Sequence, residues 1–191
     1  MAAWGMTVAS GEDRVEVSLG EVRACVRQWE DRAAAELAVP GLTRIGGGPD
    51  GDGGCFWTVR LETLGDPRAT CTLGVAGAAG PAGPSLLGRL WGGRVWLGAG
   101  RAVYAVDPWT VDVVEHGFES MVVEFAVPGP AGVLVVACET GLRGYGPDGS
   151  ERWRRDTDLI VDLRWSLRTV TVEQMDAPPL TLLVDTGAAP G

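Results

Sequence analysis

The chain has 191 residues, of which 46% are hydrophobic and 21% charged, a composition typical of one globular domain. Its formal net charge of −9 disfavours nucleic-acid binding, because phosphate recognition needs a basic surface. No apolar run approaches the ~20 residues of a membrane-spanning helix, and the first residues have no secretory-signal pattern. We therefore expect a single mainly-β domain over residues 1–191 in a cytoplasmic protein that binds neither nucleic acid nor membrane.

The residue types that are missing restrict the chemistry further. The sequence has no lysine and no asparagine, which excludes Schiff-base lysines, phosphate-loop lysines and asparagine ligands. Its four cysteines form no C-x-x-C pair, and one histidine is too few for a finger-type zinc site. We predict reduced, mostly buried thiols, no metal and no cofactor.

The first 46 residues predict a β-hairpin followed by a helix. Two β-like stretches, WGMTVAS and RVEVSL, are joined by the turn-forming residues GED. A helix is predicted over 20–38, with a capping-box pair at Ser18 and Glu21 and a stop at Pro40. Its apolar residues recur at helical spacing: Val22, Val26, Trp29, Ala33 and Leu37. We expect this stripe to pack on a sheet, with partner docking as the alternative.

Two Gly-rich stretches predict loops. GGGPDGDGG, residues 46–54, is expected to be a solvated hairpin loop. Asp50 and Asp52 raise the alternative of a calcium site, but the third acidic position and the distal glutamate of a hand-type loop are missing. Residues 74–93, which include LLGRLW, are predicted to form a long surface excursion with one short apolar element.

From residue 94 onward the pattern is that of antiparallel strands. Hydrophobic and polar residues alternate with period two, and Gly, Pro and Asp turns separate the runs. Eight strands are predicted after Asp107: 111–116, 120–127, 133–138, 142–146, 150–155, 158–166, 168–175 and 180–184.

A repeat of the turns organises these strands. Asp66, Asp107, Asp148 and Asp185 lie in similar turn sequences and are 41, 41 and 37 residues apart. These spacings are close to the ~40–45 residues of one four-stranded propeller blade. We predict antiparallel four-stranded propeller-like units over 55–187, as an open arrangement, with a closed small ring as the alternative. Each of the four aspartates should lie at a turn between antiparallel strands, in equivalent places of successive sheets.

The segment LRGYGPDGSERW resembles the repeat of quinoprotein-type (PQQ-like) β-propellers, in which a strand ends near Y-A-x-D, turns through a glycine and leads into a strand with tryptophan. VYAVDPWT and LLVDTGA match the first part of that repeat, and Trp153 occupies the tryptophan position. The resemblance covers residues 94–187 and implies a propeller-like fold. It does not imply quinone chemistry, because the chain lacks adjacent cysteines, asparagine ligands and the length of a full ring.

Two groups of polar residues are candidates for chemistry. His116 lies beside Glu115 and Glu119, and a carboxylate that orients a histidine can make it a general base. We expect instead an exposed turn histidine without a catalytic role, because no nucleophile motif accompanies it. The arginines of RWRRD, residues 152–156, are expected to pair with nearby aspartates rather than to bind phosphate.

Eight tryptophans are a large number for this length. Trp96, Trp153 and Trp165 fall in predicted strands and are expected in the core. Trp91 and Trp109 lie in loop or turn contexts, where exposed tryptophans can anchor a protein partner, although loop packing is the alternative. The first hypothesis is therefore a non-enzymatic protein-interaction module. The alternatives are an immunity-type protein that neutralises a basic toxin, and a hydrolase that uses carboxylates with His116.

Overall fold

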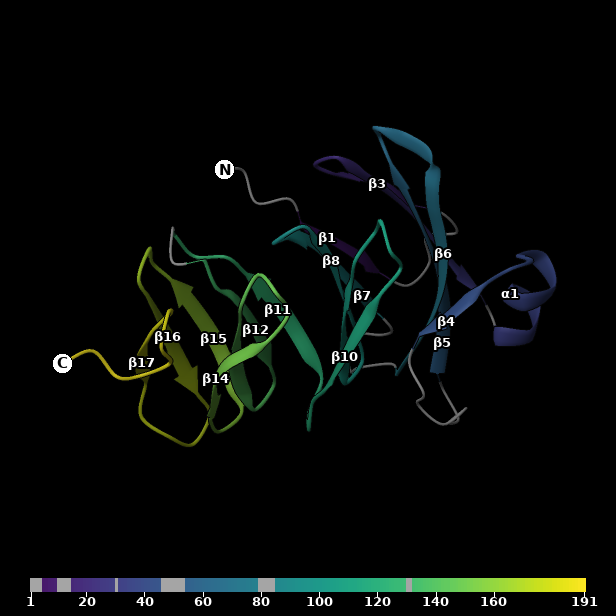
Figure 1. The fold of residues 1–191 in the computed structure, drawn as a ribbon. Coiled ribbons are helices and arrows are strands. Elements are labelled where there is room, and N and C mark those ends of the chain that lie inside the picture. The colour runs from purple at the N-terminus through teal and green to yellow at the C-terminus, as the bar shows by residue number, and fades with distance from the viewer. Residues whose placement is uncertain (1–4, 10–14, 30, 46–53, 79–84, 130–131) are drawn as a thin grey trace. The chain divides into compact units, whose positions relative to one another are not determined.

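The computed structural model describes the chain except for residues 1–4, 10–14, 30, 46–53, 79–84 and 130–131 (Figure 1). The described part is mainly β, as predicted, with seventeen strands and one helix. It divides into two compact units, Met1–Gly117 and Phe118–Gly191. The predicted single domain over 1–191 stays a prediction.

Two five-stranded sheets form unit 1. The first has the order β2-β3-β5-β6-β4, with bounds Val15–Leu19, Val22–Trp29, Gly54–Thr63, Asp66–Ala78 and Thr43–Ile45. Its strands are antiparallel except that β4 pairs with β6 in parallel, which the sequence analysis did not predict. The second has the order β1-β7-β8-β9-β10, with bounds Gly5–Ala9, Ser85–Trp91, Arg94–Ala99, Ala102–Val106 and Val113–Gly117. One hydrophobic cluster joins both sheets, from Trp57 and Leu73 in the first to Leu97 and Tyr104 in the second.

Unit 2 contains two antiparallel sheets. The four-stranded sheet β11-β12-β13-β14 has bounds Val122–Ala126, Leu134–Cys138, Gly141–Tyr145 and Glu151–Asp156. The three-stranded sheet β15-β16-β17 has bounds Ile160–Trp165, Thr169–Gln174 and Leu180–Leu183. Buried side chains of both sheets pack against each other, among them Val135 and Trp153 from the first and Val172 and Leu182 from the second. Because alternate residues of a strand point to opposite faces, these short alternating segments supply one apolar face to each sheet.

The helix predicted over 20–38 is wrong in its first half. Residues Val22–Trp29 form strand β3, and the helix α1 covers only Arg32–Ala38, with Asp31 as its N-cap in place of the predicted capping box. The spacing of four between Val22 and Val26 fits one face of a strand as well as one face of a helix, so it misled the prediction. Pairing of β3 with β5 along its whole length decided for the strand.

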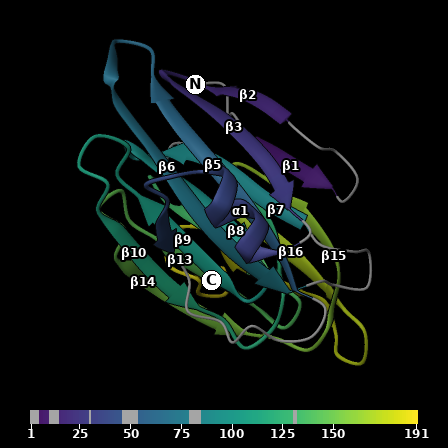
Figure 2. The same ribbon diagram turned by 90° about the vertical axis from the view of Figure 1, so that its right-hand side faces the viewer.

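The predicted apolar stripe is therefore divided between two elements. Val22 and Val26 are buried, but Leu37 is 90% exposed on α1. Trp29 is half-buried at the end of β3, where its indole donates a hydrogen bond of 2.9 Å to Thr58. The helix does pack on a sheet, as expected, since α1 contacts β5 and β3 and buries Ala35 (Figure 2).

The surface excursion predicted over 74–93 is also wrong where the structure describes it. Strand β6 continues to Ala78, and LLGRLW lies in strand β7, which buries Leu86 and Leu87. A strand that is buried on both faces shows no alternation, and glycines in it resemble a loop signal. Residues 46–53 of the predicted hairpin loop, with Asp50 and Asp52, lie outside the described residues.

All eight strands predicted after Asp107 are present, as β10 to β17. Asp66, Asp107 and Asp148 each lie at a hairpin between antiparallel strands, β5–β6, β9–β10 and β13–β14, as predicted. The hairpins β9–β10 and β13–β14 join the third and fourth strands of the meanders β7–β10 and β11–β14, whereas α1 and β4 interrupt the chain between β3 and β5. That the three places are equivalent stays a prediction. Asp185 lies in a turn after β17, and no strand follows that turn among the described residues, so its place between two strands stays a prediction.

Candidate partner-binding site

Trp91 and Trp109 come to the same end of one sheet. Trp91 ends β7 and pairs with Arg94, the first residue of β8. Val95 pairs with Val106 at the end of β9, so the loop after β9, which carries Trp109, follows at the same end. The antiparallel order of the strands thus brings together two residues that are 18 positions apart in the sequence.

The loop that carries Trp109, residues 107–112, is braced by its own hydrogen bonds. The backbone N–H of Asp107 donates to the carbonyl of Asp112 at 2.9 Å, and the N–H of Val111 donates to the carbonyl of Asp107 at 2.9 Å. The Asp107 carboxylate accepts from the N–H groups of Trp109 and Thr110 at 2.8 and 3.1 Å. The Thr110 hydroxyl donates to Asp112 at 2.8 Å. Such a loop holds the tryptophan backbone in one conformation.

Val111 has a positive φ of 62°, and no other residue of the described chain apart from glycines has one. The turn after β17 shows what this position favours. In that turn the N–H of Leu183 donates to the carbonyl of Ala188, and the N–H of Gly187 donates to the carbonyl of Leu183. These are the same two backbone bonds as in the Trp109 loop, with Gly187 at the place of Val111. Gly187 has a φ of 67°. A β-branched residue in this conformation is strained by ~1–3 kcal/mol.

We expect both Val111→Gly and Val113→Gly to lower the free energy of unfolding, with a loss that is about 1–2 kcal/mol smaller for Val111→Gly. Both valines are half-buried and pack against the same cluster of unit 1, so the lost contacts are similar. Only at position 111 does glycine also relieve backbone strain. Urea unfolding of both variants measures the difference, and equal losses would show that Val111 is not strained.

Exposure distinguishes the two tryptophans. Trp109 is 54% exposed, and Pro108 beside it is buried and anchors the loop. Trp91 is half-buried and packs on Trp96, with ring centroids 6.1 Å apart, and its carbonyl accepts from the Trp96 indole at 3.3 Å. Trp91 therefore lies at a strand end rather than in a loop, and Trp109 has the greater surface to offer. A partner-binding role for either residue stays a prediction at this point.

The three tryptophans predicted in the core differ in burial. Trp96 and Trp153 are buried, as expected. Trp165 is only half-buried, and its indole N–H donates to the Glu124 carboxylate at 3.0 Å.

His116 is not the exposed turn residue that the sequence predicts. It lies within β10, half-buried, opposite Val103, and its ring stacks on Trp96 at 6.0 Å with an interplanar angle of 8°. Glu115 points to the opposite face, where it faces Tyr104; burial and then this carboxylate raise the pKa of Tyr104 to about 12. The Glu115 carboxylate, next to His116 in the sequence, therefore points away from the His116 ring, and the hydrolase hypothesis stays a prediction.

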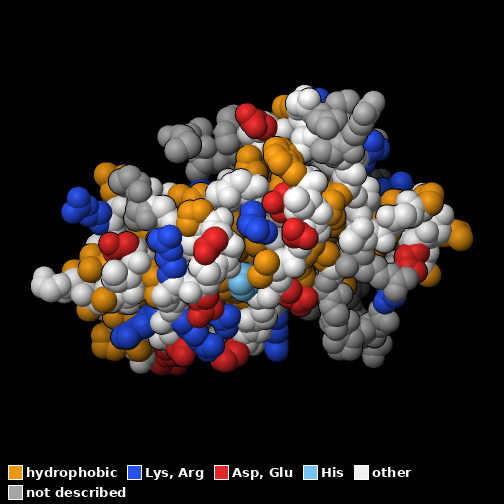
Figure 3. Space-filling model, viewed as in Figure 1, with side chains coloured by type: hydrophobic (Ala, Val, Ile, Leu, Met, Phe, Trp, Pro, Cys, Tyr) orange, Lys and Arg blue, Asp and Glu red, His pale blue; other side chains and the backbone are white. Residues whose placement is uncertain are grey.

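The arginines of RWRRD lie on β14, and Arg154 pairs with carboxylates, as predicted. Arg154 donates to Asp156 at 2.8 Å and to Glu119 at 3.0 Å. These two partners raise the pKa of Arg154 above its usual range. Trp153 points to the opposite face, into the core. Figure 3 shows basic and acidic side chains close together on this part of unit 2, a mixed surface rather than a basic one.

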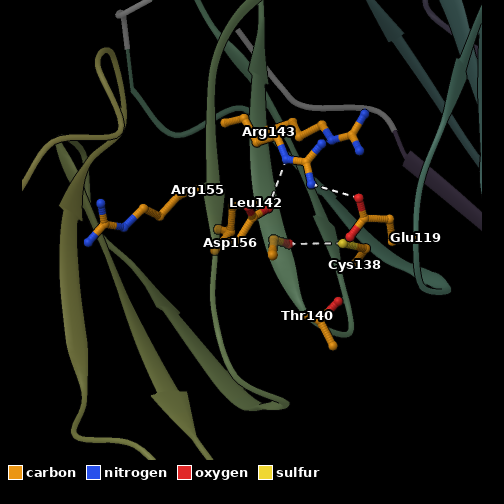
Figure 4. A pocket seen from close by; sticks show the side chains of 9 residues that line it. Glu119, Cys138, Thr140, Leu142, Arg143, Arg155 and Asp156 are labelled. Atoms are coloured by element: carbon orange, nitrogen blue, oxygen red, sulfur yellow. Dashed lines mark hydrogen bonds and ion pairs between the residues drawn. The ribbon is translucent and has the colours of Figure 1, made fainter.

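A small pocket lies beside these arginines, with room for little more than a water molecule (Figure 4). Arg154 holds Glu119 and Asp156 in its wall, and the Cys138 thiol donates to a backbone carbonyl at 3.3 Å. Arg155 points away from the other labelled side chains (Figure 4). Within the described ranges, no three His, Cys, Asp or Glu residues gather in a way that could hold a metal ion. The pocket thus combines paired charges and a thiol that is already hydrogen-bonded.

The comparisons with known proteins assign no family. No protein-family model matches the chain, and no curated protein matches its sequence. Among the described residues, no helix is long and apolar enough to cross a membrane.

The sequence does not predict the hydrogen bonds that brace the Trp109 loop as a whole. It predicts Asp107 as a turn residue, and the bonds of the Asp107 side chain to Trp109 and Thr110 fit that role. The strain at Val111 has no signal in a single sequence, because valine gives no indication of a left-handed backbone.

Proposed function

We propose that this protein is a protein-interaction module whose contact surface is built around Trp109. The observation that carries the proposal is a tryptophan that is 54% exposed on a loop held by its own hydrogen bonds. Tryptophan is enriched among the residues that dominate binding energy at interfaces. A loop that is already ordered loses little conformational entropy when a partner covers it.

The expected energetic contribution of Trp109 is large. A tryptophan buries ~150–250 Å² when covered fully, so covering the exposed half removes roughly 100 Å² from water. At about 25 cal/mol per Å² this is ~2–3 kcal/mol, the range of an interface hot spot. Trp91, half-buried at the same end of the sheet, would border the contact and extend it.

We also propose that the repeated strands are an open set of propeller-like units of the quinoprotein type. The succession of strands supports this. β10, the fourth strand of one meander, is followed by the meander β11–β13, and β14 is in turn followed by the meander β15–β17. A backbone hydrogen bond closes the loop after the third strand of each unit, β9, β13 and β17. The N–H donors of these bonds belong to Asp107, Gly146 and Leu183, which are 39 and 37 residues apart.

A crosslinking experiment tests the interaction proposal. A photoreactive benzoylphenylalanine is placed at position 109, and as a matched control at Leu37, which is 90% exposed on α1. We expect a defined crosslinked partner from position 109 and none from position 37. Trp109→Ala should weaken binding of that partner about 30-fold, whereas Leu37→Ala should leave it unchanged. Equal crosslinking from both positions, or no effect of Trp109→Ala, would refute a Trp109-centred interface.

The acidic net charge of −9 favours one particular kind of module, an immunity-type protein that neutralises a basic toxin. The identity of the crosslinked partner decides this second candidate: a basic toxin or nuclease supports it, and an acidic or neutral partner contradicts it.

A further inference from the structure

The surroundings of Trp109 define the chemistry of what it can bind. The backbone N–H of Asp107 and the carbonyl of Asp112 close the loop that carries the exposed indole, so an aspartate lies at each end of this loop. Asp107 is half-buried and uses one carboxylate oxygen for two backbone N–H groups. Asp112 is exposed, and the one bond described for its carboxylate comes from Thr110. The loop 107–112 thus carries an exposed indole and an exposed carboxylate, three residues apart in the sequence.

We infer that the partner of this site presents a cationic side chain, an arginine or a lysine, which stacks on Trp109 and pairs with Asp112. This inference rests on the proposed interaction function. The face of an indole carries negative potential and attracts a cation, most strongly among the aromatic side chains. A carboxylate adjacent to it binds the N–H groups of the same cation by charge-assisted hydrogen bonds.

The net charge of the chain is consistent with this occupant. A charge of −9 attracts a basic surface over a distance of about one Debye length, and it repels an acidic peptide or a nucleic acid. An uncharged apolar partner would use the indole but not the carboxylate. An acidic peptide, a nucleic acid and an uncharged apolar partner should therefore respond differently from a basic partner to changes at Trp109 and Asp112.

The test uses the full chain and a fluorescently labelled peptide of alternating arginine and glycine, with a glutamate–glycine peptide and a single-stranded oligonucleotide as comparison probes. We expect the arginine peptide to bind, and the other two not to bind, in fluorescence anisotropy at low salt. Raising NaCl from about 50 to about 300 mM should weaken binding several-fold. Binding of the glutamate peptide or the oligonucleotide in preference would overturn the inference.

Matched variants separate a specific site from general attraction. Trp109→Leu keeps an apolar side chain but removes the aromatic face, and should weaken binding of the arginine peptide about tenfold. Asp112→Asn keeps an acceptor for Thr110 but removes the charge, and should weaken it about tenfold as well. The control Asp185→Asn removes one exposed charge in unit 2 and should change binding less than twofold. If Asp112→Asn and Asp185→Asn act equally, or if Trp109→Leu binds normally, the inference is wrong.

The failure of this inference is distinguishable from the failure of the proposed function. A partner that crosslinks at position 109 but binds Asp112→Asn normally leaves the function in place and refutes the cation. If binding of the arginine peptide depends on Trp109 and Asp112 but no partner crosslinks at position 109, the cation site is supported and the proposed Trp109-centred protein interface is refuted. Unchanged melting temperatures of all variants establish that the loop substitutions leave the fold intact.

Discussion

Trp153→Ala is expected to lower the free energy of unfolding by about 3–5 kcal/mol, the usual cost of removing a large aromatic side chain from a core. Trp153 is buried on β14 and packs in the cluster between the two sheets of unit 2. Its indole N–H donates a buried hydrogen bond of 2.9 Å to the carbonyl of Val184, just after β17. One side chain therefore joins the last strand of one sheet to the end of the other.

Two further variants separate packing from hydrogen bonding. Trp153→Phe keeps most of the ring but leaves the Val184 carbonyl without its donor, and should cost about 1–3 kcal/mol. Trp109→Ala removes an exposed indole and should cost less than ~0.5 kcal/mol. Urea unfolding followed by far-ultraviolet circular dichroism measures all three. If Trp153→Ala is no worse than Trp109→Ala, Trp153 does not hold the two sheets of unit 2 together.

Gly144→Ala should have the second large effect. We expect overpacking to lower the free energy of unfolding by about 1–3 kcal/mol or more. Gly144 lies opposite Trp153 in the β13–β14 ladder, and a Cβ there would overlap the Nε1 and Cε2 atoms of the indole. Gly187, in the turn after β17, contacts the same ring, since a Cβ there would lie 2.6 Å from Cε3. The Trp153 indole thus packs directly against the backbone of two glycines, Gly144 and Gly187.

The dependence on Trp153 gives this prediction its control. In the Trp153→Ala background, the indole that the added methyl group would strike is gone, so Gly144→Ala should then cost much less, a coupling that a double-mutant cycle measures. Gly65→Ala, at a turn with nothing within 4 Å of the added Cβ, should change stability little. Equal costs of Gly144→Ala in both backgrounds would mean that backbone conformation, not the indole, requires the glycine.

Alternating hydrophobicity was enough to predict the mainly-β fold and all eight strands after Asp107. Each of these strands is half-exposed or lies between clear turn residues, so its pattern depends on local geometry alone. The positions of Asp107 and Asp148 at hairpins were predictable for the same reason, because their side chains bond to the backbone two residues further on. The burial of Trp153 also followed from its place in an alternating strand.

Tertiary structure decided what local patterns leave open. Val22 and Val26 suit a helix and a strand equally, and only pairing with β5 selected the strand. Strand β7 has no alternation because it is a buried central strand, and His116 is half-buried because Trp96, two strands away, lies against its ring. The candidate site depends on such long-range contacts throughout. The exposure of Trp109 and the left-handed backbone of Val111 arise from how β9 and β10 are joined, which single-residue preferences do not encode.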